Sequence, residues 1–212
     1  MPFLMIRNDI TKVCADAIVN PANTQLQEGS GTSRAIYLAA GEKQLISACK
    51  KIGYCDEGKA VITDAFHLPA KYIIHAVGPV WQDGNSGEED CLYHTYMESL
   101  NLAVKYKLDS IAFPLLSSGN YGFPKEKALK IAISAISDFL LEQEMLVYLV
   151  IYDKESLSVS KKLIQDIEEY IDNNYIDKNK EDYHSNRRQL VNRDISEYKE
   201  CQFFRRSDAP KS

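Results

Sequence analysis

The segment at residues 17–41 constrains the fold of this chain most. It begins with a short apolar run at residues 17–19, continues through a polar loop that contains Gly29-Ser30-Gly31, and ends in an Ala-rich run closed by Gly41. We interpret it as a buried strand, a loop and a helix. The first turn of a helix carries unpaired N–H groups and the positive end of the helix dipole. The layout therefore predicts an anion site at this loop.

A second segment has the same layout. An apolar run at residues 110–115 leads into the loop Ser117-Ser118-Gly119-Asn120-Tyr121-Gly122-Phe123-Pro124, and an amphipathic helix follows at residues 125–141. Backbone N–H groups and small side chains in this loop would allow an anion to approach closely. The alternative is an ordinary strand-to-helix turn with two aromatic side chains in the core. Two such loops after two strands of one sheet favour a phosphate-bearing ligand.

Strands and helices alternate along most of the chain. We expect further strands at residues 1–7, 60–63, 72–77 and 146–152, and further helices at 42–51, 92–105 and 156–172. This alternation predicts an α/β fold with a central, largely parallel sheet, whose functional loops lie at the carboxyl ends of the strands. From about residue 173 the sequence is charged and poor in apolar residues. We therefore expect a domain at 1–172 and a charged C-terminal extension or linker at 173–212, which either docks back or contacts a partner or a further domain.

The composition disfavours several classes of function. The formal net charge is −5, so binding to a nucleic-acid backbone is not expected. The longest apolar run, at residues 145–152, is too short to cross a bilayer, and we expect no membrane association. The cysteines form an odd set without a Cys-x-x-Cys pair, and no secretory leader is visible, which favours reduced cysteines in a cytoplasmic protein. Cys91 and His94 lack a compact third ligand, so neither a metal nor a cofactor is expected.

Several short pieces of the sequence resemble the macrodomains, a family that binds ADP-ribose. In chain order they are Asn8-Asp9-Ile10-Thr11, the run at 16–23 that ends in Asn20-Pro21-Ala22-Asn23, Gly29-Ser30-Gly31 with the run to Gly41, His75-Ala76-Val77-Gly78-Pro79, and the loop at 114–124. The resemblance covers residues 1–172. It implies a three-layer α/β/α sandwich with a mixed central sheet, and ADP-ribose or an ADP-ribosylated protein as the partner.

The resemblance also implies roles for individual residues. Asp9 would accept a hydrogen bond from the adenine amino group beside the Ile10 backbone, and Asn23 would reach the distal ribose. Tyr152 would stack on adenine, with an ordinary edge-strand tyrosine as the alternative. Asn20 would face a ligand hydroxyl or only satisfy the loop backbone, and Arg34 would lie over the diphosphate or only be solvated. The expected diphosphate loops comprise Gly29, Ser30, Gly31, Thr32, Ser117, Ser118, Gly119, Asn120, Tyr121 and Gly122, with Phe123 beside the distal ribose.

One position departs from the hydrolytic members. MacroD-type enzymes carry Gly-Gly-Gly-Val-Asp-Gly-Ala-Ile-His, and the acidic residue of that motif falls at Ser33 here. A serine supplies neither the charge nor the basicity of a carboxylate near pH 7, and we expect it to cap the helix instead. Asn23 remains the catalytic candidate, with Ser33 in doubt. Two functions stay open: hydrolysis of mono-ADP-ribose from proteins or deacetylation of O-acetyl-ADP-ribose, and a non-catalytic reader of ADP-ribose.

Overall fold

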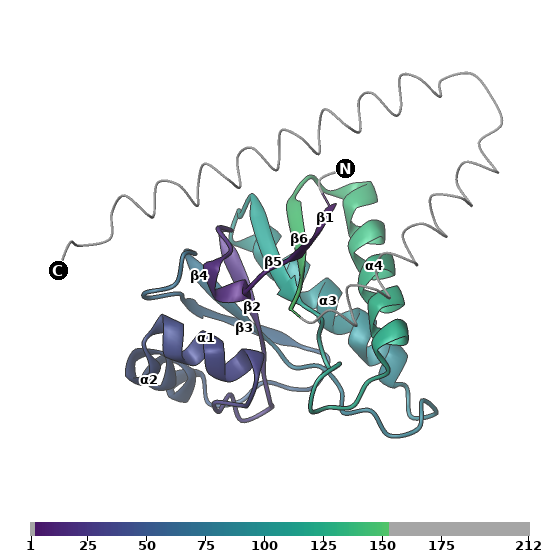
Figure 1. The fold of residues 1–212 in the computed structure, drawn as a ribbon, viewed down its shortest axis with the longest axis horizontal. Coiled ribbons are helices and arrows are strands. Elements are labelled where there is room, and N and C mark those ends of the chain that lie inside the picture. Colours follow the sequence, from purple (N-terminus) through teal and green to yellow (C-terminus); the bar gives the residue numbers. More distant parts are fainter. Residues whose placement is uncertain (1–2, 153–212) are drawn as a thin grey trace, which may run out of the picture. The chain divides into compact units, whose positions relative to one another are not determined.

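A six-stranded mixed sheet forms the middle layer of the computed structural model, which describes residues 3–152 (Figure 1). The strand order is β1-β6-β5-β2-β4-β3. All neighbouring strands are parallel except β3, which runs antiparallel to β4. The strands are β1 (Phe3–Arg7), β2 (Ala17–Pro21), β3 (Ala60–Asp64), β4 (Tyr72–Ala76), β5 (Ser110–Pro114) and β6 (Leu146–Ile151). The carboxyl ends of the parallel strands therefore meet at one edge of the sheet.

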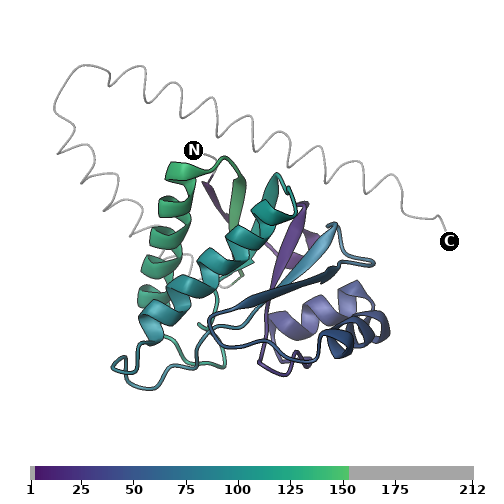
Figure 2. The same ribbon diagram turned by 180° about the vertical axis from the view of Figure 1, so that it is seen from behind.

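Helices cover both faces of this sheet, which confirms the expected three layers. Figures 1 and 2 show α1 and α2 on one face and α3 and α4 on the other. A short 3-10 helix, η1, follows β1. The bounds are η1 (Ile10–Lys12), α1 (Thr32–Ala40), α2 (Glu42–Ile52), α3 (Glu88–Lys105) and α4 (Lys125–Glu142).

The strands are apolar along most of their length because both faces of the sheet are covered. Ile18, Ile73, Ile111 and Val147, one from each of four adjacent strands, are fully buried. Most element bounds agree with the prediction within two residues. Helix α3 is longer than expected, because it begins at Glu88, directly after Gly87 in a left-handed conformation.

Some expectations lie outside the described residues: the helix at 156–172, the domain boundary at 172 and the extension at 173–212. None of the described helices combines the length and the apolar character that a bilayer crossing requires. Cys49, Cys55 and Cys91 are free thiols. Cys14 is disulfide-bonded, so the expectation of reduced cysteines is wrong for this residue.

Candidate ligand-binding site

Two adjoining cavities lie at the carboxyl ends of the parallel strands. The larger, of about 490 Å³, is lined by segments that follow β2, β4 and β5 and by the start of α1. The smaller, of about 380 Å³, is lined by residues that follow β1 and by the end of β6. Gly31, Thr32, Pro114 and Tyr152 line both cavities. The two cavities therefore form one elongated site, the cleft.

The N-terminus of α1 faces the larger cavity. Gly31 is the N-cap, at a φ of 57°, and it lines the cavity together with Thr32 and Ser33. The N–H groups of Ser30 and Gly31 make no hydrogen bond to any described residue. The N–H of Gly29 is occupied, because it donates to Ser33 Oγ at 3.2 Å. The start of α1 thus presents free backbone donors and the positive end of a helix dipole to the cavity.

Ser33 has a different role from the one expected. Helix α1 begins at Thr32 and its N-cap is Gly31, so Ser33 is not the cap. The Ser33 side chain is buried, and its hydroxyl accepts the Gly29 N–H from the loop that precedes the helix. Ser33 therefore fixes the loop against the first turn of α1 from within the helix.

The second loop also presents free donors to the larger cavity. The N–H groups of Ser118, Gly119, Asn120 and Tyr121 have no hydrogen-bond partner among the described residues. Ser117 adopts a left-handed backbone conformation with a φ of 59°. Ser117 lines the cavity, and its buried hydroxyl is one of two side-chain polar atoms in the described part of the chain that have no partner. Buried polar groups normally have partners, so this hydroxyl is an unused donor of a residue that lines the cavity.

A side-chain contact joins the two loops. The Asn120 amide donates to Ser30 Oγ, and both residues line the larger cavity. Lys125, the first residue of α4, lines it as well. The larger cavity has no carboxylate and no imidazole among its described lining residues. Burial raises the pKa of Tyr121, so this hydroxyl stays protonated and uncharged at neutral pH. The surroundings therefore suit an anion.

The smaller cavity brings Asp9, Ile10 and Tyr152 together. Asp9 caps η1, because its Oδ1 accepts the Thr11 N–H at 3.0 Å and the Thr11 hydroxyl at 2.7 Å. The second carboxylate oxygen lies 3.7 Å from Lys12 Nζ at the surface. Tyr152 is 77% exposed, so its ring is accessible to a flat ligand group.

Asn23 lies at the larger cavity with its amide already oriented. Its Nδ2 donates to the Gln27 carbonyl at 2.9 Å, and its Oδ1 accepts the Gln27 N–H at 3.0 Å. A carboxamide has two N–H donors and two acceptor lone pairs. One donor and one lone pair of Asn23 therefore remain for a ligand, in a direction that the Gln27 backbone fixes.

The structure does not bring four of the expected residues to the cleft. Asn20 is buried in the sheet beside its register partner His75, with Nδ2 3.1 Å from His75 Nδ1. The Arg34 guanidinium pairs with Glu28 and lies 4.0 Å from Glu42. Gly122 and Phe123 do not line either cavity. The Gly122 N–H donates to the Gly119 carbonyl, and the Phe123 ring is buried against Trp81.

Lys125 and Gly78 are among the cleft residues that sequence reasoning missed. Lys125 directly follows Pro124 and begins α4, so its place at a helix start was the sequence signal that could have identified it. Gly78 lies in the His-Ala-Val-Gly-Pro run and also lines the larger cavity. A Cβ at Gly78 would be 2.5 Å from Ser117 Oγ. Only glycine therefore leaves room for the Ser117 side chain in its observed position.

A buried polar chain links the sheet to the loop of Asn23. His75 Nε2 lies 3.0 Å from Thr63 Oγ1 and 3.7 Å from Cys49 Sγ, and burial lowers the pKa of His75 to about 4. Cys49 is in turn 3.3 Å from the Tyr37 hydroxyl, which donates to the Leu26 carbonyl at 2.9 Å. Neutral side chains on β3, β4, α1 and α2 thus support the loop that precedes α1.

Comparisons with known proteins agree with this arrangement. The Macro domain family model matches residues 19–132. A Macro domain-containing protein of Methanosarcina mazei is 48% identical over 165 residues, which cover 77% of this chain and 88% of the relative. An O-acetyl-ADP-ribose deacetylase of Escherichia fergusonii is 43% identical, with 76% of this chain and 93% of the relative covered.

Solved structures show the same fold. The Oceanobacillus iheyensis macrodomain with ADP superposes with a TM-score of 0.76 at 35% identity, over 80% of this chain and 93% of that one. The Trypanosoma brucei macrodomain in complex with ADP-ribose gives a TM-score of 0.71 at 32% identity, over 77% of this chain and 69% of that one.

Proposed function

Because the chain belongs to the Macro domain family, we propose that it binds ADP-ribose in the cleft, either free or attached to another molecule. The adenine would occupy the smaller cavity, beside Asp9, Ile10 and Tyr152. The diphosphate would lie between the two loops of the larger cavity, and the distal ribose would approach Asn23. The solved structures of the Oceanobacillus iheyensis macrodomain with ADP and of the Trypanosoma brucei macrodomain with ADP-ribose support this choice of ligand.

One observation carries the proposal: donors without a partner among the described residues converge from two separate loops on one cavity, and no described residue that lines it is acidic. Backbone N–H groups at residues 30–31 and 118–121 have no partner among the described residues, and the buried Ser117 hydroxyl lacks one as well. Two phosphates offer enough acceptor oxygens to satisfy these donors, and the helix N-terminus favours their charge. This explains how a protein with a formal net charge of −5 can bind an anionic ligand.

Calorimetric titration with ADP-ribose, with AMP as the comparison ligand, tests the proposal. We expect ADP-ribose to bind more tightly than AMP, which lacks the second phosphate and the distal ribose. A dissociation constant for ADP-ribose weaker than about 1 mM, roughly −4 kcal/mol, would overturn the proposal.

An Asp9→Asn variant tests the orientation of the ligand. Asparagine keeps one oxygen to cap Thr11 but removes the charge that would accept from the adenine amino group. We expect about tenfold weaker binding of both ADP-ribose and AMP, since a hydrogen bond to a charged group contributes about 1.5–3 kcal/mol. Asp64→Asn, at the exposed end of β3, is the matched control and should leave both affinities unchanged. If Asp9→Asn and Asp64→Asn bind ADP-ribose and AMP equally well, the adenine does not lie beside Asp9.

We further propose that the chain deacetylates O-acetyl-ADP-ribose, and the observation that favours this is the similarity to relatives named as deacetylases. Water would attack the acetyl carbonyl carbon, and the bond between this carbon and the ribose oxygen would break. Acetate would form, and the ribose oxygen would take up the proton lost by the water and become a free hydroxyl. Asn23, with its amide fixed by Gln27, would orient the ribose or the water. No described residue of the larger cavity supplies a carboxylate base, so the water would be activated by a phosphate oxygen of the substrate.

Acetate release from O-acetyl-ADP-ribose separates this activity from a reader without turnover. Wild type should release acetate above background, and Asn23→Ala should be slower by about 100-fold, as expected when a reactant is no longer held in position. The affinity of Asn23→Ala for ADP-ribose must be measured alongside, because the substitution also removes the two contacts with Gln27. If both proteins release acetate only at the background rate while wild type still binds ADP-ribose, the protein is a reader without turnover.

A further inference from the structure

We propose that Glu88 and Trp81 are positioning residues for the second ligand loop, at residues 117–121. Neither residue lines the larger cavity. Glu88 instead organises the segment at 82–86, and this segment holds Trp81 against the base of the ligand loop. The inference rests on the proposed binding of ADP-ribose in the cleft.

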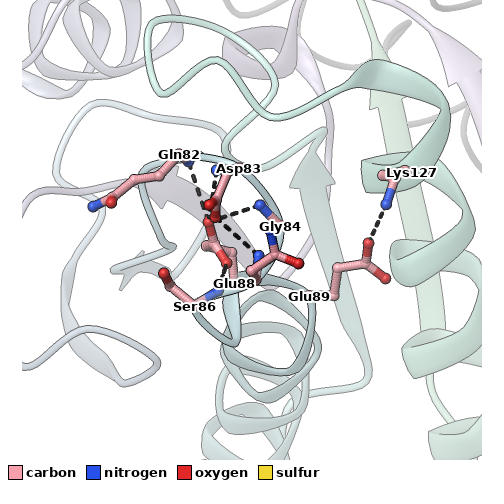
Figure 3. Close-up of polar contacts among 8 residues, drawn as sticks. Gln82, Asp83, Gly84, Ser86, Glu88, Glu89 and Lys127 are labelled. Carbon is pink, nitrogen blue, oxygen red and sulfur yellow. Dashed lines mark hydrogen bonds and ion pairs between the residues drawn. The ribbon is translucent and has the colours of Figure 1, made fainter.

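The Glu88 carboxylate is the centre around which the segment at 82–86 folds (Figure 3). Its Oε1 accepts the N–H groups of Gln82 at 3.2 Å, Asp83 at 3.3 Å and Gly84 at 3.2 Å. Its Oε2 accepts the Ser86 N–H at 2.8 Å. Glu88 as a whole is only 5% exposed. A single carboxylate therefore satisfies four backbone donors of one loop, which no neutral side chain of this size can do.

The electrostatics keep this carboxylate charged. Glu88 is the first residue of α3, where the helix dipole favours a negative charge. Hydrogen bonds from its own N–H and from the loop N–H groups lower the pKa of Glu88 to about 2. The four contacts therefore persist across the pH range in which ligand binding would be measured.

The organised segment packs directly on Trp81. Gly84 adopts a φ of 81°, and a Cβ there would lie 2.6 Å from Trp81 Cη2. The Trp81 ring also packs on Phe123, with 4.6 Å between ring centroids. Lys127 Nζ lies 5.3 Å from the centre of the same ring and also pairs with Glu89 (Figure 3). Trp81 is thus held between the start of α3 and the start of α4.

Trp81 in turn fixes both ends of the ligand loop. Its backbone N–H donates to the Tyr121 carbonyl at 2.8 Å, and Tyr121 lines the larger cavity. Its ring contacts Phe123, whose N–H donates to the Ser117 carbonyl at 3.0 Å. Ser117 has a left-handed backbone conformation and an unpartnered buried hydroxyl. Such a conformation persists only where the surroundings enforce it, and the Trp81–Phe123 pair supplies part of that support.

The test uses Glu88→Gln with Glu89→Gln as the matched control. Both are glutamates of the first turn of α3, but only Glu88 accepts from the loop N–H groups, whereas Glu89 pairs with Lys127. We expect Glu88→Gln to weaken ADP-ribose binding about tenfold and AMP binding less than twofold. Glu89→Gln should change both affinities less than twofold. A ligand-selective loss is the readout, because a general loss of stability would affect both ligands in proportion.

Intrinsic fluorescence gives an independent readout, because Trp81 is the only tryptophan of the chain. Glu88→Gln should shift the emission to longer wavelength and increase quenching by acrylamide in the folded, ligand-free protein, whereas Glu89→Gln should not. Circular dichroism and thermal melting establish that each variant is folded at the temperature used. If Glu88→Gln does not fold, Trp81→Phe replaces it, with about threefold weaker ADP-ribose binding and unchanged AMP binding as the expected result.

Three outcomes would overturn the inference. The first is that Glu88→Gln binds ADP-ribose as tightly as wild type does. The second is that Glu88→Gln loses affinity for ADP-ribose and AMP equally. The third applies if Glu88→Gln does not fold, and it is that Trp81→Phe changes neither affinity. If wild type binds neither ligand, it is the proposed function that fails. The fluorescence comparison between Glu88→Gln and Glu89→Gln still decides in that case whether the carboxylate holds Trp81 in place.

Discussion

Replacing Ser117 by alanine should stabilise the free protein and weaken ADP-ribose binding at the same time. Ser117 is 7% exposed, and its hydroxyl is buried and has no hydrogen-bond partner among the described residues. A buried polar group without a partner costs about 1–3 kcal/mol. Removing the hydroxyl also removes its packing against Gly78, so we expect a net gain of about 1 kcal/mol in the free energy of unfolding.

The effect on binding has the opposite sign. If the hydroxyl donates to a phosphate oxygen, its loss should weaken ADP-ribose binding about tenfold, since a hydrogen bond to a charged group contributes about 1.5–3 kcal/mol. The backbone strain at Ser117, with a φ of 59°, is retained because alanine is also an L-residue with a Cβ. The alanine variant therefore isolates the hydroxyl, whereas a glycine variant would also relax the backbone.

Urea unfolding without ligand and calorimetry with ADP-ribose measure the two effects. Ser99→Ala is the matched control, because the Ser99 hydroxyl is also buried but donates to the Thr95 carbonyl at 2.8 Å. This control should lower the free energy of unfolding by about 1 kcal/mol and leave the affinity unchanged. The reasoning is refuted if Ser117→Ala destabilises the protein as Ser99→Ala does, or if its affinity for ADP-ribose stays within twofold of wild type.

Three other substitutions have clear expected outcomes. Arg34→Ala should leave ADP-ribose affinity within twofold, because the guanidinium pairs with Glu28 and not with the cleft, and a tenfold loss in calorimetry would contradict this. His75 has a pKa lowered to about 4 by burial, so its stabilising contribution is complete above pH ~6.5 and falls as the pH drops toward 4, by up to about 1.4 kcal/mol per pH unit. Urea unfolding at pH 7 and pH 4.5 should therefore show a smaller loss for His75→Gln than for wild type, and equal losses would exclude this origin. Ser33→Asp should raise acetate release by about 100-fold if a missing base limits turnover, while an unchanged rate would show that a base at this position is not limiting.

The sequence predicted the parts of the site that depend on local signals. Helix α1 forms in the predicted Ala-rich run and ends before Gly41, because apolar spacing and the glycines at both of its ends are properties of one short segment. The gathering of Asp9, Ile10 and Tyr152 in one cavity follows from the topology, since parallel strands end at the same edge of a sheet.

Side-chain directions set by distant residues could not be predicted in this way. Asn20 follows a buried strand like a ligand residue, but the register of β2 with β4 pairs it with His75 inside the sheet. Arg34 begins a helix near an anion site, yet Glu28 and Glu42 attract its guanidinium. In each case the deciding partner comes from a segment whose position depends on the tertiary fold.

The same limit applies to Glu88, because no local signal distinguishes it from its acidic neighbour Glu89 in the first turn of α3. Its burial becomes visible only when the segment at 82–86 is seen to fold back over α3 and to direct four N–H groups at the carboxylate. Gly84 permits that fold, and Trp81 occupies the space that its missing side chain leaves. We infer that the two ligand loops are supported in different ways. Ser33 fixes the first loop from inside α1, and a charged residue of α3, acting through Trp81, fixes the second.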